Sequence, residues 1–187
     1  ARTAARASEY GTAAYTDIER MLAAEHPDLV TVCLPNEHHF GPTLQVIQAG
    51  VPLLAEKPLV LELDQANRLI READDRNLFF GINFNHRYAE PVARAKAAVD
   101  AGELGELVFA TWRFGGEANM ADSPHANLIE TQCHGFDMLE HLCGPIVSVA
   151  AQMTNKTYGA FSTMAIALEF AEQRLTYQAT HDGLTGL

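Results

Sequence analysis

The stretch 51–60, VPLLAEKPLV, constrains the fold more than any other part of the sequence. Its apolar run 53–55 is typical of a short strand in a parallel sheet that is covered on both faces. Glu56 and Lys57 follow directly, and Pro58 disfavours a helical conformation at Lys57. Open α/β sheets bind ligands at the carboxyl ends of their strands, so this charged pair is a candidate binding site. The alternative is an ordinary strand end with a solvated ion pair.

Strand and helix patterns alternate through the first half of the chain. Further strands are expected at residues 13–15, 29–34 and 78–82, and helices at 1–10, 18–25, 38–49 and 63–76, with Thr16 or Asp17 as a helix cap. A polar turn follows at residues 83–88. Repeated strand–helix–strand units of this length predict right-handed crossovers and a doubly wound parallel sheet.

The pattern changes near Glu90. A helix to residue 101 precedes a strand at 107–114, a helix at about 126–142, and strands at about 146–154, 162–170 and 175–181. One helix followed by successive strands with short turns predicts an α+β domain with an antiparallel sheet. We therefore expect one domain at 1–88, an interdomain helix and turn at 89–104, and a second domain at 105–187.

Composition excludes several classes of protein. The formal net charge is −11, which argues against a surface for nucleic acid or anionic membranes. No apolar run approaches the 18 residues of a membrane-spanning helix. Three cysteines in apolar segments (Cys33, Cys133 and Cys143) suggest free, buried thiols and a cytoplasmic location. The opening ARTAARAS has the composition of a transit peptide, but the simpler interpretation is a helix cut partway along.

Several longer segments carry a resemblance to a known family. These are YGTAAYTDIERML, PDLVTVCLPNEHH, AGVPLLAEKPL, FNHRYAEPVARAKAAVDAGELGEL and CHGFDMLEHLCGPIVSV. In order and spacing the chain resembles the Gfo/Idh/MocA oxidoreductases across nearly its whole length. The resemblance implies an N-terminal Rossmann domain, a C-terminal domain with a large open antiparallel sheet, and NAD or NADP as cofactor. It also implies a sugar or polyol substrate and a homodimer or homotetramer packed through the C-terminal sheet.

The chain departs from the family at its beginning. Family members start with a strand and a Gly-rich turn that holds the cofactor pyrophosphate, yet no G-x-G-x-x-G occurs here. We therefore expect a fragment of a longer enzyme, or a chain with further residues at its ends. The residue that selects NAD or NADP should precede Ala1. The chain as written is expected to bind cofactor weakly.

A second group of polar residues lies in NLIETQCHGFDMLEHLCG. On an α-helix Glu130, His134, Asp137 and His141 are spaced four, three and four apart and would share one face. By resemblance, His134 is the acid/base and Lys57 orients or polarises the substrate oxygen. Glu130, the third catalytic candidate, stands where polyol dehydrogenases often have Asp. Cys133, His134, His141 and Cys143 converge poorly, so we expect no metal site.

The resemblance also assigns binding residues. The expected cofactor-binding residues are Leu34, Pro35, Asn36, His39, Glu56, Lys57, Pro58, Asn85 and Arg87, and the expected substrate-binding residues are Asp137 and Arg87. Each has a structural alternative. His39 could cap the helix that follows it, Arg87 could form an interdomain salt bridge, and Asp137 could orient His134.

The function that we expect is hydride transfer between NAD(P) and a sugar, polyol or related alcohol carbon, in a cleft between the two domains. One alternative is an NAD-dependent glycosidase of the same family, which oxidises its substrate only transiently. Another is a non-catalytic homologue that senses ligand or dinucleotide. A pure binding module needs neither Lys57 nor His134, which favours an enzyme.

Overall fold

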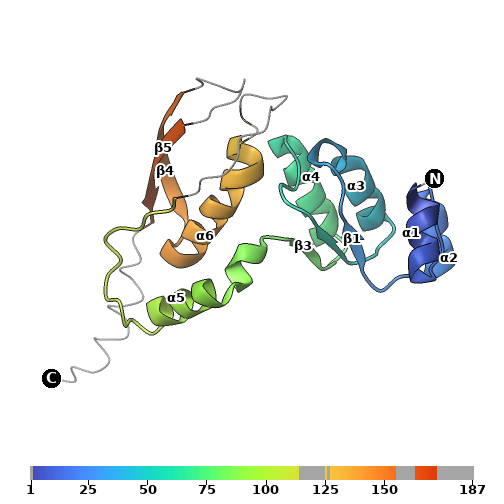
Figure 1. The fold of residues 1–187 in the computed structure, drawn as a ribbon, viewed down its shortest axis with the longest axis horizontal. Coiled ribbons are helices and arrows are strands. Elements are labelled where there is room, and N and C mark those ends of the chain that lie inside the picture. The colour runs from blue at the N-terminus through green and yellow to red at the C-terminus, as the bar shows by residue number, and fades with distance from the viewer. Residues whose placement is uncertain (1, 114–124, 126, 155–162, 172–187) are drawn as a thin grey trace. The chain divides into compact units, whose positions relative to one another are not determined.

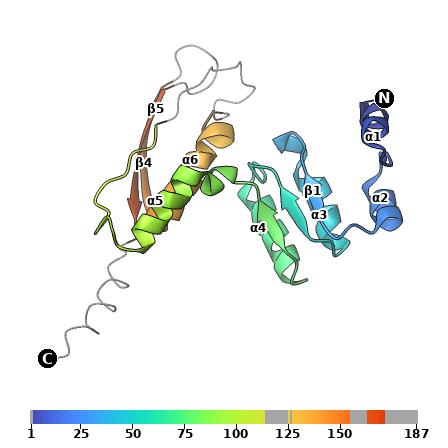
Figure 2. The same cartoon turned by 60° about the horizontal axis from the view of Figure 1, so that its bottom comes forward.

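The computed structural model describes residues 2–113, 125, 127–154 and 163–171. The chain separates into two compact units, Ala1–Asn83 and Phe84–Leu187. Figures 1 and 2 show the elements of each unit. The described part of the first unit contains α1 (Arg2–Tyr10), α2 (Ile18–Glu25), β1 (Val30–Val32), η1 (Asn36–His38), α3 (Phe40–Gln48), β2 (Leu53–Ala55), α4 (Leu63–Asp74) and β3 (Phe80–Ile82).

The three strands of the first unit form a parallel sheet in the order β1-β2-β3. Leu54 of β2 pairs with Thr31 of β1 and with Gly81 of β3, so the three strands end together. The amide of Glu56 donates to the carbonyl of Val32, and that of Asn83 donates to the carbonyl of Ala55. The residues that follow the three strands are thus brought to one edge of the sheet. This is the α/β arrangement expected for a Rossmann domain.

Helices α3 and α4 supply the core of this unit. Val46 and Ile47 of α3 and Leu69 of α4 are fully or almost fully buried with Leu53 and Ala55 of β2. Burial of each Val, Leu or Ile side chain in this core contributes about 1.5–3 kcal/mol. Helix α2 begins as expected, because the Asp17 side chain accepts a hydrogen bond of 2.8 Å from the amide of Arg20. The buried core therefore includes β2, the strand that leads to Glu56 and Lys57.

Two expectations for the first unit were wrong. Residues 13–15 form no strand, because among the described residues nothing pairs with their backbone, and a strand exists only through such a ladder. Cys33 is exposed instead of buried. Side chains alternate between the faces of a strand, and inward-facing Val32 leaves its neighbour Cys33 outside.

The described part of the second unit contains η2 (Asn85–Tyr88), α5 (Glu90–Asp100), a π-helical turn η3 (Asn127–Gln132), α6 (Cys133–Cys143), β4 (Ile146–Thr154) and β5 (Thr163–Phe170). Pro91 occupies the first turn of α5, where its missing amide costs nothing. Strands β4 and β5 form an antiparallel pair with an irregularity between Ile146 and Ser148. The antiparallel second domain was expected from the sequence.

Two further expectations for this unit were wrong. Residues 107–113 contain the β-branched and aromatic residues typical of a strand but form none, and Val108 and Phe109 are 89% and 86% exposed. These residue types favour a strand, but no other strand in the described part of the chain pairs with this segment. The helix expected at 126–142 is π-helical before Cys133. The strand expected at 175–181 lies outside the described residues.

Within the described part of the chain, every helix is too short or too polar to cross a membrane.

Candidate functional site

Glu56 and Asn83 are joined at the carboxyl edge of the parallel sheet. Asn83 Nδ2 donates to Glu56 Oε1 at 2.7 Å, and the amide of Lys57 donates to Glu56 Oε2 at 3.3 Å. Glu56 follows β2 and Asn83 follows β3, so parallel pairing brings these residues together. The Glu56 carboxylate is thereby fixed by two donors. Lys57 itself is half-buried, and its peptide bond to Pro58 is cis.

His39 lies in the core of the first unit. Its ring is fully buried, with Nδ1 2.9 Å from the carbonyl oxygen of Pro58 and Nε2 2.6 Å from that of Leu34. It makes no side-chain capping bond to α3. The imidazole therefore connects the loop after β1 to the loop after β2. Its contact with Pro58 holds the backbone that follows Lys57. The cofactor-binding role expected for His39 stays a prediction.

The other residues of the predicted cofactor set occupy loops. Leu34 and Pro35 are exposed, Asn36 is half-buried at the start of η1, and Asn85 is exposed at the start of η2.

In the second unit the ring of His134 lies in an aromatic cluster. The rings of His134 and His86 are stacked, with centroids 4.1 Å apart and planes inclined by 9°. Phe84 approaches His134 edge-on, at 6.1 Å and 85°. His134 is the second residue of α6 and His86 belongs to η2, so tertiary packing alone brings the two imidazoles together.

Arg87 and Asp137 bind each other. Arg87 Nε donates to Asp137 Oδ2 at 2.7 Å and Nη2 donates to Oδ1 at 2.5 Å. The hydrogen bond with Asp137 raises the pKa of Arg87, so the guanidinium stays charged. A salt bridge was the structural alternative for Arg87, but here both partners belong to the second unit. The pair fixes η2 on α6 one turn beyond His134.

Trp112 packs on α6 beside this cluster. Its Nε1 donates to Gln132 Oε1 at 3.2 Å, and its ring is 6.3 Å from that of His86. A Cβ atom at Gly135 would lie 2.3 Å from Trp112 Nε1. Position 135 therefore requires glycine because of this close approach and not because of its backbone conformation.

The four polar residues predicted on one helix face occupy different environments. Glu130 is exposed in the π-helical turn, His134 and His141 are half-buried, and Asp137 is buried. A shared face requires α-helical winding throughout, whereas the segment before Cys133 is π-helical, with i→i+5 winding. The buried face of α6 is made by Gly135, Asp137 and Met138. π-Helical turns occur frequently at functional sites.

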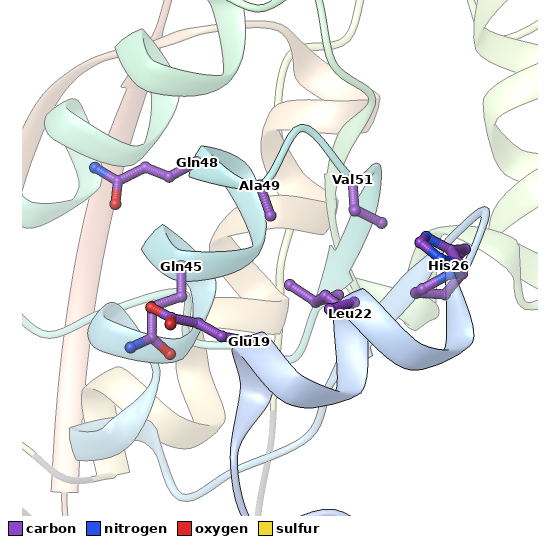
Figure 3. Close-up of a pocket in the computed structure, with 9 residues that line it drawn as sticks. Glu19, Leu22, His26, Gln45, Gln48, Ala49 and Val51 are labelled. Carbon is purple, nitrogen blue, oxygen red and sulfur yellow. The ribbon is translucent and has the colours of Figure 1, made fainter.

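Among the described residues, no group of three or more His, Cys, Asp or Glu side chains could hold a metal ion. A cavity of about 600 Å³ lies between α2 and α3 (Figure 3). Its lining includes Leu22, His26 and Val51, which are labelled in Figure 3. Val51 precedes β2, so the cavity lies at the opposite end of the sheet from Glu56 and Lys57.

Comparison with known protein families gives a match on each side of the boundary between the two units. Residues 1–84 match the oxidoreductase family with NAD-binding Rossmann fold, GFO_IDH_MocA. Residues 92–182 match the GFO/IDH/MocA C-terminal domain. The chain belongs to the Gfo/Idh/MocA family.

Curated Gfo/Idh/MocA relatives include dehydrogenases of sugars and polyols. The chain is 34% identical over 110 residues to D-glucoside 3-dehydrogenase of Escherichia coli, with 58% of this chain and 31% of the relative covered. It is 29% identical over 153 residues to inositol 2-dehydrogenase of Corynebacterium glutamicum, with 80% and 45% covered. The chain thus spans between about a third and a half of the length of these relatives.

Solved structures show the same fold. Levoglucosan dehydrogenase in complex with NADH and levoglucosan superimposes with a TM-score of 0.77 at 19% identity, over 90% of this chain and 52% of the other. The WlbA dehydrogenase from Bordetella pertussis, in complex with NADH and UDP-GlcNAcA, gives a TM-score of 0.73 at 21% identity, with the same coverage. The expected Rossmann and C-terminal domains of the Gfo/Idh/MocA family are confirmed.

Asn83 and His86 belong to the candidate site although neither was predicted as a site residue from the sequence. Asn83 is the first polar residue after a strand of the parallel sheet, as Glu56 is, and this shared position could have identified it. His86 lies in the run Asn85-His86-Arg87, of which only the outer two residues were selected. Nothing in that tripeptide indicates a partner as distant in the sequence as His134.

Proposed function

We propose that the protein containing this chain is an NAD(P)-dependent oxidoreductase that acts on a hydroxyl-bearing carbon of a sugar or polyol. The observation that carries this proposal is that each of the two domains contains a side chain able to donate a hydrogen bond to a hydroxyl oxygen or accept its proton. Lys57 follows β2 at the carboxyl edge of the sheet, and His134 lies near the start of α6. The curated relatives named glucoside and inositol dehydrogenases support the same class of substrate.

Residues at the edge of the parallel sheet fit a nicotinamide cofactor. Dinucleotides bind outside the carboxyl ends of such strands, where Asn36, Glu56, Lys57 and Asn83 gather. The bound cofactor supplies a hydride acceptor at its nicotinamide ring. The Asn83–Glu56 hydrogen bond and buried His39 hold the backbone on either side of Lys57. These contacts support the proposal that the backbone around Lys57 is held in place before the cofactor binds. They do not distinguish NAD from NADP.

In the proposed reaction the alcohol loses a proton from oxygen and a hydride from carbon. The His134 imidazole accepts the hydroxyl proton, and the Lys57 ammonium donates a hydrogen bond to the same oxygen as negative charge develops on it. With the cofactor bound, the C–H electron pair would pass to the nicotinamide ring as a hydride while the C=O bond forms. Arg87 and Asp137 serve this step indirectly, because their ion pair holds η2 on α6.

Steady-state kinetics of the intact enzyme test the assignment, with sugars and inositols as substrates and cofactor binding measured in parallel. His134→Ala should lower kcat by roughly 10²–10⁴ and leave the cofactor Kd almost unchanged. Lys57→Ala should lower kcat and raise KM, and Lys57→Arg should not restore activity, because a guanidinium is larger and differently shaped. His141→Ala, in the last turn of α6, is the matched control. A His134→Ala enzyme with wild-type kcat contradicts the proposal.

The proposal includes assembly and location. We expect a homodimer or homotetramer packed through the sheet that contains β4 and β5, in the cytoplasm. On these strands Val149, Ala151 and Met153 pair with Leu168, Ile166 and Met164. Residues directly opposite one another in an antiparallel ladder project from the same face, so these six apolar side chains form one surface. Val149 is 61% exposed on it.

A further inference from the structure

The stacked imidazoles of His86 and His134 have a geometry that constrains the orientation of one ring by the other. Their planes are inclined by 9° and their centroids lie 4.1 Å apart, which is contact distance for flat rings. Both side chains are half-buried. Rotation of either ring about its Cβ–Cγ bond would break the stack.

The ring of His86 is itself held in place. Trp112 lies at 6.3 Å with its plane inclined by 52°, and Trp112 is hydrogen-bonded to Gln132 at the end of the π-helical turn. The neighbouring residue Arg87 is bonded through two nitrogens to Asp137. Consecutive residues of η2 thus contact α6, one by stacking and one by an ion pair. His86 therefore meets His134 as part of a rigid support.

A proton acceptor needs this kind of support. The terminal torsion of a histidine side chain has broad energy wells, so an isolated imidazole samples a range of ring planes. Productive proton transfer requires one ring nitrogen to point at the substrate hydroxyl within hydrogen-bond reach. A hydrogen-bond partner would orient the ring through a nitrogen. A stacked ring orients the imidazole through contact with its flat face, and this contact uses neither ring nitrogen.

We infer that His86 is a positioning residue for His134, which acts through the flat face of its ring and not through proton exchange. The inference rests on the proposed role of His134 as proton acceptor. It gives His86, the middle residue of Asn85-His86-Arg87, a role in orienting the His134 ring. It also predicts that another flat ring can replace the imidazole.

Two variants of His86 in the intact enzyme separate stacking from proton exchange. His86→Phe keeps a flat ring without nitrogens and should retain kcat within about threefold of wild type. His86→Leu removes the ring and should lower kcat by roughly 10- to 100-fold, with substrate KM and cofactor Kd little changed. Tyr88→Leu, at an 82% exposed residue of the same turn, is the control for general damage. If Phe is as poor as Leu, or if Leu is as active as wild type, the inference is overturned.

A second measurement does not depend on activity. The imidazole ¹³C–¹H signal of His134, assigned by its loss in His134→Asn, should move in His86→Leu because the stacked ring and its ring current are gone. It should move much less in His86→Phe. If His134→Ala is fully active, the proposed function fails while this measurement still tests the stack. A His134 signal that is the same in wild type and His86→Leu overturns the stacking inference, whatever the kinetics show.

Discussion

Arg87 and Asp137 form a two-point ion pair, with Nε 2.7 Å from Oδ2 and Nη2 2.5 Å from Oδ1. The side chain of Asp137 is only 6% exposed, whereas that of Arg87 is 37% exposed. Removal of Arg87 would leave a buried carboxylate without its cation, and this costs more than the loss of a surface pair. Asp137 therefore depends on Arg87 for its charge partner more than Arg87, which water also reaches, depends on Asp137.

Arg87→Met should lower the free energy of unfolding by about 1–3 kcal/mol, a figure reduced from that of a fully buried pair because Arg87 is partly solvated. The double variant Arg87→Met with Asp137→Asn should be more stable than Arg87→Met alone, since it removes the orphaned charge. Urea denaturation measures both. Arg94→Met, which breaks the exposed pair with Glu90, should change stability by less than about 0.5 kcal/mol. Equal effects of the Arg87 and Arg94 changes would contradict the prediction.

Asn83→Ala should lower kcat roughly 3- to 30-fold, because the Glu56 carboxylate beside Lys57 loses its 2.7 Å hydrogen bond. Asn83→Asp should be worse, since it places a second carboxylate against Glu56. Asn67→Ala, on the exposed side of α4, serves as the control. Turnover measured at saturating substrate and cofactor decides the matter, and an unchanged kcat in Asn83→Ala would remove the positioning role.

Gly135→Ala should destabilise the second unit by about 1–3 kcal/mol, because the new methyl group overlaps Trp112. In a Trp112→Leu background the same change should cost much less, since the overlapping ring is absent. Thermal unfolding of the two single variants and the double variant measures this coupling. Gly41→Ala in α3, where a Cβ meets nothing within 4 Å, should be neutral or stabilising. Additive effects at Gly135 and Trp112 would count against the close contact.

Val149→Glu should weaken the proposed oligomer by at least about tenfold in Kd, because it places a charge in the apolar surface of β4 and β5. Ala150→Glu is the matched control, since Ala150 pairs with Ala167 on the opposite face of the ladder. Sedimentation or light scattering at micromolar concentration measures the mass. An intact oligomer in the Val149 variant, or a wild-type protein that is monomeric, would show that this surface is not the interface.

Local patterns predicted the elements that carry the proposed chemistry. The apolar run at 53–55 is strand β2, and the charged pair after it lies at the carboxyl edge of the sheet as expected. Asp17 could be recognised as a helix cap because capping depends on residues only three apart. Both features depend on residues close together in the sequence, where spacing and residue type carry most of the information.

The features that escaped prediction depend on distant partners. The segment 107–113 contains strand-favouring residues but lacks a pairing strand among the described residues, and residue type alone cannot show that. The burial of His39 depends on carbonyls from two separate loops. The stack of His86 on His134 depends on how η2 docks against α6. Winding of the π-helical turn was also missed, because an α-helical spacing was assumed for all residues of that segment.

The π-helical turn at Asn127–Gln132 links the position of Glu130 to the number of residues in that segment. Such a turn accommodates one residue more than an α-helical turn, so deletion of a single residue there would rewind the segment as α-helix. Glu130 would then swing to a new direction while His134 and α6 stayed in place. A one-residue deletion would therefore move the carboxylate of this proposed catalytic residue without any substitution.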